Sequence, residues 1–202
     1  MMTKARAGFA LLALLLPLLL NANYFIKNDL LTPKASKIIE EIGDELSDKT
    51  GIHLYVLATN EKFPKEMNLI KYSRKFDSNL SKPYVILFFA PHNKRVGLIP
   101  SSKNIGSMYD PESVKDATID VVATNDSNTK KDKYNIGIVQ GYSELADQIA
   151  GSKHVEMAKT LPNETRNIIA VLKYLVILGS MLVLWVFIIR PIYMRIKHGK
   201  RE

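Results

Sequence analysis

The sequence predicts a small α/β sandwich, in which a central sheet of three or four strands is flanked by helices. Two apolar runs, Ile52–Thr59 and Tyr84–Ala90, are rich in β-branched and aromatic residues and have the length of strands. The second run is almost continuously apolar, which indicates a strand buried on both faces of a sheet. Around these runs, apolar residues recur at helical spacing. An α+β arrangement with helices on one face only is the alternative.

The fold prediction also includes an apolar segment at each end of the chain. Residues Ile168–Ile189 contain one charge, Lys173. As a helix this run would be roughly 33 Å long, enough to cross a hydrocarbon core of about 30 Å. Residues 1–22 place basic side chains before the apolar run Phe9–Leu20, which is typical of a signal peptide cleaved after Ala22 or of an uncleaved signal anchor.

The position of the charges predicts an orientation. The chain has a formal net charge of +8, but residues 23–167 contain 20 Lys and Arg against 19 Asp and Glu. The basic excess therefore flanks the apolar segments, including the tail 190–202, and basic flanks tend to remain cytoplasmic. We expect the intervening domain on the outer, periplasmic side of a bacterial inner membrane, a location compatible with the absence of cysteine. The near-neutral domain argues against a nucleic-acid partner.

The first predicted helix follows a cap signal. Thr32 is suited to the N-cap, Pro33 to the first helical position and Gly51 to a left-handed stop. Its apolar stripe comprises Ala35, Ile39, Ile42 and Leu46. A second helix is expected within Lys65–Leu80, before the strand that begins at Tyr84.

The remaining elements follow in order. Pro91–Lys94 predicts a turn and Arg95–Pro100 a returning strand. Asp110 and Pro111 repeat the cap signal, ahead of a helix whose stripe comprises Val114, Ala117, Val121 and Val122. The polar segment Asn125–Lys133 predicts an exposed loop. A last amphipathic helix, with Ile138, Tyr142, Leu145 and Ile149 in its stripe, is expected to end near Gly151. The domain is thus expected over residues 31–151, with a polar tether over 152–167.

This order of elements resembles the TPM domain family. The resemblance is carried by the segments DKTG and IHLYVLAT, by YVILFFAPHNKRVGLIPS and MYDPESVKDATIDVV, and by YNIGIVQGYSELADQI. The family includes thylakoid-lumen acid phosphatases, receptor-modulating membrane proteins and bacterial envelope proteins. The resemblance implies an exported α/β domain, often with a C-terminal membrane helix, and acidic residues that help to hold a divalent cation.

The candidate metal ligands are Asp110, Glu112 and Asp77. Asp110 matches an acidic position of the family, and oxygen ligands of this kind suit Ca²⁺ or Mg²⁺. The family's Asp-Asn-Gly-like turn before the central strand is replaced here by Leu80–Pro83, which contains no carboxylate. The alternative for Asp110 is a helix cap, and Asp-Pro-Glu at a helix start favours the cap.

These features of the sequence support three hypotheses for the function. The favoured hypothesis is a non-catalytic accessory module, tethered to the bilayer, that binds an inner-membrane or periplasmic protein and aids assembly, maintenance or regulation of a membrane complex. The alternative is a divalent-cation-dependent phosphatase acting on phosphomonoesters. A structural or lipid-contact role is less favoured, because the domain has no large basic excess.

Overall fold

The computed structural model describes the backbone of residues 23–64, 66–125, 127–162 and 164–190, and the side chains in these ranges except those of 164–173. The chain divides into two compact units between Leu161 and Pro162, and each unit is described by itself. The predicted signal segment, 1–22, and nearly all of the predicted basic tail, 190–202, lie outside the described residues.

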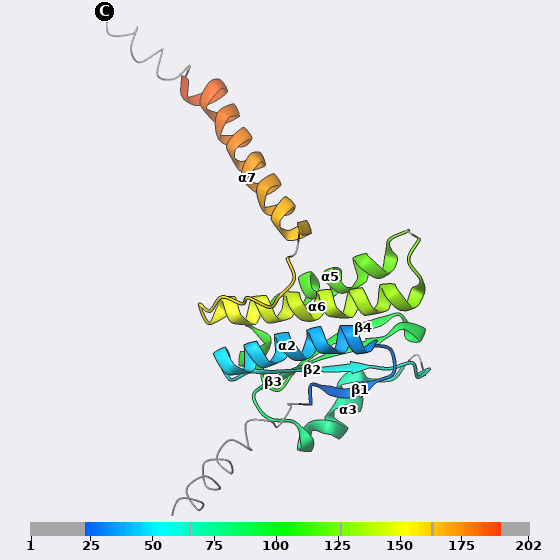
Figure 1. Cartoon of the computed structure of the whole chain (residues 1–202). Coiled ribbons are helices and arrows are strands. Elements are labelled where there is room, and N and C mark those ends of the chain that lie inside the picture. Colours follow the sequence, from blue (N-terminus) through cyan, green and yellow to red (C-terminus); the bar gives the residue numbers. More distant parts are fainter. Residues whose placement is uncertain (1–22, 65, 126, 163, 191–202) are drawn as a thin grey trace, which may run out of the picture. The chain divides into compact units, whose positions relative to one another are not determined.

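The first unit is a mixed α/β domain around a four-stranded sheet of order β1-β2-β3-β4 (Figure 1). Strands β1 (Phe25–Asn28), β2 (His53–Ala58) and β3 (Tyr84–Ala90) are parallel, and β4 (Arg95–Pro100) is antiparallel to β3. The predicted strands are confirmed, and all seven residues of β3 are buried, as a strand covered on both faces requires. Strand β1 was not predicted, because its four residues end in polar Lys27 and Asn28.

Helix α2 (Pro33–Thr50) forms as predicted. The Thr32 side chain accepts a hydrogen bond from the Ala35 N–H, and Gly51 ends the helix with φ of 70°. The four predicted stripe residues are buried against one face of the sheet. Helix α2 therefore connects β1 to β2 across this first face.

The connection from β2 to β3 crosses the opposite face. It contains α3 (Leu69–Ser73) and a 3₁₀ helix, η2 (Arg74–Asn79), which together are shorter than the helix predicted over 65–80. Their aromatic side chains Tyr72 and Phe76 pack against the second face of the sheet. Helical elements thus cover both faces, and the one-faced α+β alternative is wrong.

Two long helices complete the layer on the first face. After a short 3₁₀ turn, η3 (Pro91–Asn93), strand β4 and the short α4 (Lys103–Gly106), helix α5 (Pro111–Ala123) packs on α6 (Lys130–Ser152). Within α5, the fully buried side chains are Val114 and Thr118, so the buried face differs from the predicted stripe. Thr129 caps α6, which shortens the predicted loop 125–133.

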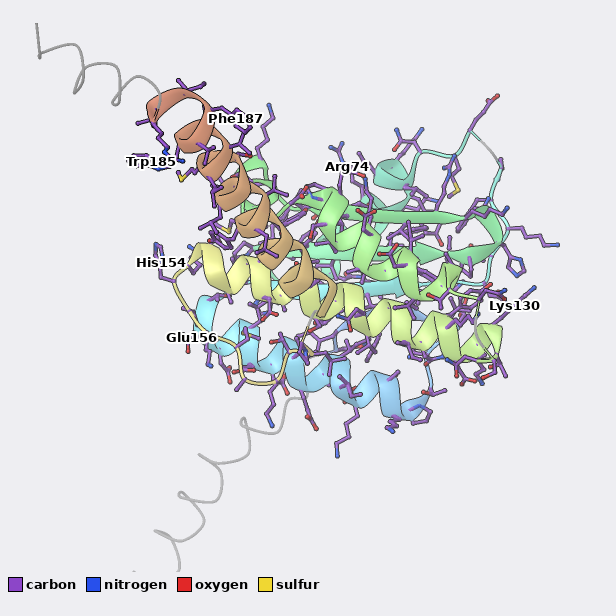
Figure 2. The ribbon with its side chains drawn as sticks, turned by 90° about the horizontal axis from the view of Figure 1, so that it is seen from above. Arg74, Lys130, His154, Glu156, Trp185 and Phe187 are labelled. Atoms are coloured by element: carbon purple, nitrogen blue, oxygen red, sulfur yellow. The ribbon has the colours of Figure 1, made fainter. Side chains whose placement is uncertain are left out.

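The chain after α6 turns back along the domain. Figure 2 shows the segment from His154 to Glu156 leaving the end of α6 and running beside α2. Val155, Met157 and Leu161 pack against the core. We call residues 153–161 the strap. The sequence predicted a tether over 152–167, but its first part is folded onto the domain because its apolar side chains are covered there.

The second unit contains α7 (Glu164–Leu184), which continues into a π-helical segment, η4 (Trp185–Ile189). Large apolar side chains from Tyr174 to Ile189 are exposed, and Trp185 and Phe187 are seen to project from the helix in Figure 2. Among the described residues, no helix is both long enough and apolar enough to cross a membrane. The membrane span expected over residues 168–189 stays a prediction, because the side chains of residues 168–173 are not among those that the structure describes.

Candidate functional site

The structure places Asp110 and Glu112 at the start of α5. Asp110 Oδ1 accepts a hydrogen bond from the Glu112 N–H at 3.1 Å, and the Asp110 N–H donates to Gln148 at 2.6 Å. Glu112 is paired with Lys115 at 2.7 Å, one turn along the helix. Asp110 therefore acts as the helix cap that the alternative reading expected, and its neighbouring carboxylate already faces an ammonium.

Asp77 lies away from this pair, on the other side of the sheet. It belongs to η2, whose neighbours Phe76 and Leu80 pack on the second face, whereas Tyr109 and Val114, on either side of Asp110, belong to the core on the first face. The four-stranded sheet separates the two positions, so the predicted three-carboxylate site does not form.

The surroundings of Asp77 also differ from those of a metal ligand. Its carboxylate accepts a hydrogen bond from the Tyr84 hydroxyl and lies 3.3 Å from the Lys82 ammonium. The hydrogen bond from Tyr84, with Lys82 as a further cause, lowers the pKa of Asp77. Burial and this carboxylate together raise the pKa of Tyr84 to about 12. Within the described residues, no group of three or more His, Cys, Asp or Glu side chains is arranged to hold a metal ion.

One prediction separates the cap from the ligand. Replacing Asp110 with alanine is expected to destabilise the domain by about 1 kcal/mol, because an N-cap acceptor is lost. Thermal unfolding in the presence of Ca²⁺, Mg²⁺ or chelator is expected to show the same difference throughout. A cation-dependent rise in the unfolding temperature that disappears in Asp110→Ala would instead identify a ligand.

A polar cluster lies at the carboxyl ends of β1 and β2. The Lys27 ammonium donates to Glu61 and lies 3.2 Å from Asp29 Oδ2. Thr59 donates to the same Asp29 oxygen at 3.1 Å, and the Tyr72 hydroxyl donates to Glu61 at 3.4 Å. Carboxyl ends of parallel strands are where α/β proteins commonly bind ligands. Here, however, a lysine supplies the cation between the two carboxylates.

The pKa shifts of Lys27 and Asp29 agree with this ion pairing. The hydrogen bond to Glu61 raises the pKa of Lys27, with Asp29 as a second cause. Partial burial disfavours the Asp29 anion, but hydrogen bonds from the Asn60 N–H, Lys27 and Thr59 prevail and lower its pKa. Lys27 and Asp29 therefore both keep their charges at neutral pH, and the cluster holds the edge strand β1 to the loop after β2.

Sequence reasoning missed this cluster because it missed β1. If no strand is expected over Phe25–Asn28, nothing in the sequence places Asp29 at the end of a strand. Nothing then places Lys27 on the edge of the sheet either. The usable signal was the short apolar pair before Lys27, followed by the Asp29 acid at a turn.

Two hollows flank α6. One, of about 450 Å³, lies between β4, the end of α5 and the start of α6. The other, of about 430 Å³, lies between α2 and α6 beside the strap residue Leu161. The apolar lining of the first comes from Phe89, Val96, Ile119, Val122 and Tyr134, and its charged lining from Lys94 and Arg95. Both hollows are suited to apolar contact rather than to acid–base chemistry.

Neither a protein-family model nor a curated protein sequence matches this chain. Among solved structures, the chain is similar to the BA42 protein of the psychrophilic bacterium Bizionia argentinensis, determined by NMR. The two share 16% identity over 67% of this chain and 96% of that chain, with a TM-score of 0.44.

Proposed function

We propose that this chain is a membrane-tethered accessory module with a TPM-like domain. The domain would face the periplasm of a bacterial inner membrane and bind a membrane or periplasmic protein, aiding assembly, maintenance or regulation of a membrane complex. The role is one of binding rather than catalysis.

The observation that carries the proposal is the exposed apolar helix that follows the folded domain. From Tyr174 to Ile189, the large apolar side chains are exposed to 39–73%. Exposing so continuous an apolar surface to water is unfavourable, so a bilayer or a protein partner is expected to cover it. Together with the basic flanks in the sequence, this favours insertion with the C-terminus in the cytoplasm.

The strap limits how far the domain can stand from that helix. Because residues up to Leu161 pack on the domain and α7 begins at Glu164, residues 162 and 163 lie between the strap and this helix. At up to about 3.5 Å per residue, these two residues reach roughly 7 Å, and the helical residues 164–167 before the apolar run add roughly 6 Å at about 1.5 Å per residue. A domain held this near a membrane would meet the external parts of membrane proteins at high effective concentration.

Contacts at the polar sites also favour binding over catalysis. Asp77, Asp110 and Glu112 are each satisfied by a neighbour, and Lys27 neutralises the two carboxylates at the carboxyl edge. What the domain offers a partner is apolar hollows between its helices.

Removal of the apolar helix tests the tether. A chain ending at Asn167 is expected to appear in the soluble periplasmic fraction, whereas the full chain stays with membranes after alkaline carbonate extraction. As a matched control, a chain whose residues 168–189 are replaced by an alternating leucine–alanine span should fractionate like the full chain. Full-length protein that carbonate releases from membranes would contradict the tether.

Partner binding requires a second measurement. Crosslinking in intact cells, followed by isolation of the full chain in mild detergent, is expected to recover a defined membrane or periplasmic protein. The leucine–alanine chain should recover the same protein if the domain is the binding unit. Recovery of no enriched protein, combined with hydrolysis of a phosphomonoester by the purified chain, would overturn the proposal in favour of a phosphatase.

A further inference from the structure

Strand β4 leaves one edge of the sheet open. It forms the sheet edge opposite β1 and pairs only with β3 among the described strands (Figure 1). At the opposite edge, β1 is short, its register with β2 is irregular, and it contains Lys27. These features discourage pairing with a further strand. In β4, the single charged residue is Arg95, whose guanidinium donates to the Met67 carbonyl at 2.7 Å.

The register of β3 and β4 shows which backbone groups face outward. The Ser101 N–H donates to the Tyr84 carbonyl at 2.8 Å, so these residues form a hydrogen-bonded pair. Such pairs alternate along an antiparallel ladder, so Gly97 and Ile99 bond to β3. Val96 and Leu98 therefore direct their N–H and C=O groups away from β3. Within the described residues, neither makes a backbone hydrogen bond outside the strand pairing.

The hollow beside this edge determines which side chains fit. Val96 lines it from the strand, and Ile119 and Val122 line it from α5. Side chains alternate between the faces of a strand, so an added strand would direct every second side chain toward this apolar surface. Ile119 is 43% exposed there, an apolar residue without a covering element in the described structure.

Charge selects the occupant. The charged residues that line the hollow are Lys94 and Arg95, and no carboxylate lines it among the described residues. Since Arg95 is held by Met67, the exposed Lys94 at the start of β4 is the cation available to a ligand. A second copy of the segment Lys94–Pro100 would bring two more basic residues and no carboxylate. A segment carrying a carboxylate is therefore favoured.

We propose that the β4 edge binds an extended segment of the partner protein by strand addition, with apolar residues at alternate positions and a carboxylate beside Lys94. This inference rests on the proposed function, because it names the surface with which the accessory module holds its partner. Backbone hydrogen bonds would supply affinity, and the hollow would supply specificity.

A synthetic peptide tests the edge. The probe is a fluorescein-labelled peptide of alternating serine and valine with a C-terminal aspartate, added to the full chain in detergent micelles. Binding is measured by fluorescence anisotropy and by slowed hydrogen exchange of the Val96 and Leu98 amides. A peptide ending in lysine amide is expected to bind at least fivefold more weakly. No slowing of exchange at about millimolar peptide would overturn the proposal.

Matched substitutions separate edge pairing from packing. Leu98→Pro removes an outward N–H, whereas Leu98→Ala removes side-chain packing and keeps that donor. We expect Leu98→Pro to bind the peptide at least tenfold more weakly than Leu98→Ala. Lys94→Glu should weaken binding at least fivefold, and Lys71→Glu, an exposed lysine on α3, should leave it unchanged. Equal binding by the two Leu98 variants would overturn the proposal.

Two further outcomes also decide the matter. If the full chain dimerises and Leu98→Pro abolishes the dimer, the edge serves a second copy and the proposal fails. If Leu98→Pro still recovers the crosslinked partner, the β4 assignment is wrong while the proposed function stands. Failure of the proposed function would look different, because the unmodified chain would then recover no partner.

Discussion

Replacing Gly141 with alanine is expected to lower the free energy of unfolding of the α/β domain by about 3 kcal/mol, the upper part of the range for overpacking a core. A Cβ at this position would lie 1.9 Å from Thr118 Oγ1 and 3.1 Å from Thr118 Cβ. Thr118 is fully buried, and its hydroxyl donates to the Val114 carbonyl at 2.9 Å. Helices α5 and α6 must therefore separate to admit one methyl group.

The same substitution elsewhere in α6 provides the control. At Gly151, a Cβ would meet no atom within 4 Å. Gly151→Ala is expected to leave stability unchanged or raise it by up to about 1 kcal/mol, because alanine favours helix. Urea unfolding followed by circular dichroism measures both. Adding Thr118→Ala to Gly141→Ala should recover part of the loss; full stability in Gly141→Ala alone would contradict the packing of α5 on α6.

Replacing Glu45 with alanine is expected to release the strap from α2, at a cost of about 3 kcal/mol for the lost charge-assisted hydrogen bonds. The carboxylate is 12% exposed and accepts from the backbone N–H groups of Ala158 at 2.8 Å and Lys159 at 2.7 Å. Lys49 donates to it at 2.7 Å. Faster hydrogen exchange at residues 158 and 159, and proteolysis within 153–161, would report the release.

The same contact gives a pH dependence. Burial disfavours the Glu45 anion, but the hydrogen bonds from Lys49, Ala158 and Lys159 prevail and lower its pKa below the usual value. The contact therefore stabilises the strap fully above the pKa that Glu45 has in the unfolded chain, and this contribution is lost as the pH falls from there through the lower folded pKa. Glu45→Ala should remove the acid-dependent step at residues 158 and 159.

Glu41, one turn earlier on α2, supplies a matched control. Its pairing with Lys37 is 4.0 Å long, and both side chains are largely exposed, at 48% and 76%. Surface pairs of this kind contribute little, so Glu41→Ala is expected to change stability by less than about 1 kcal/mol. Equal protease sensitivity of the Glu41 and Glu45 variants would show that the strap is held by its apolar contacts instead.

Long, strongly patterned elements were predictable because their local signals agree with their burial. Thr32 and Gly51 mark the ends of α2, and Asp110 marks the start of α5, by satisfying backbone groups that any helix end exposes. Strand β1 and the strap were not recognised as ordered elements, because each acquires its structure from contacts distant in sequence. Met157, for example, is an apolar residue in a polar stretch, and only the folded structure shows that it packs against the core.

The candidate site divides in the same way. Capping by Asp110 is visible in the sequence, since it depends on Asp110 and the two residues that follow it. The separation of Asp77 from Asp110 is not, because it depends on the β2–β3 connection crossing the face of the sheet opposite α2. The Lys27 cluster depends on parallel pairing of β1 with β2, residues separated by a whole helix.

By itself, the sequence determined the order of the main strands and helices, the segregation of basic charge to the ends of the chain and the presence of a long apolar segment, because these follow from composition and from periodicity along the chain. Only the tertiary structure decided which carboxylates meet, where the folded domain ends and which edge of the sheet stays open. Those features depend on which face of the sheet each connection crosses and on the backbone register between strands. The spacing of apolar and polar residues along the sequence determines neither of them.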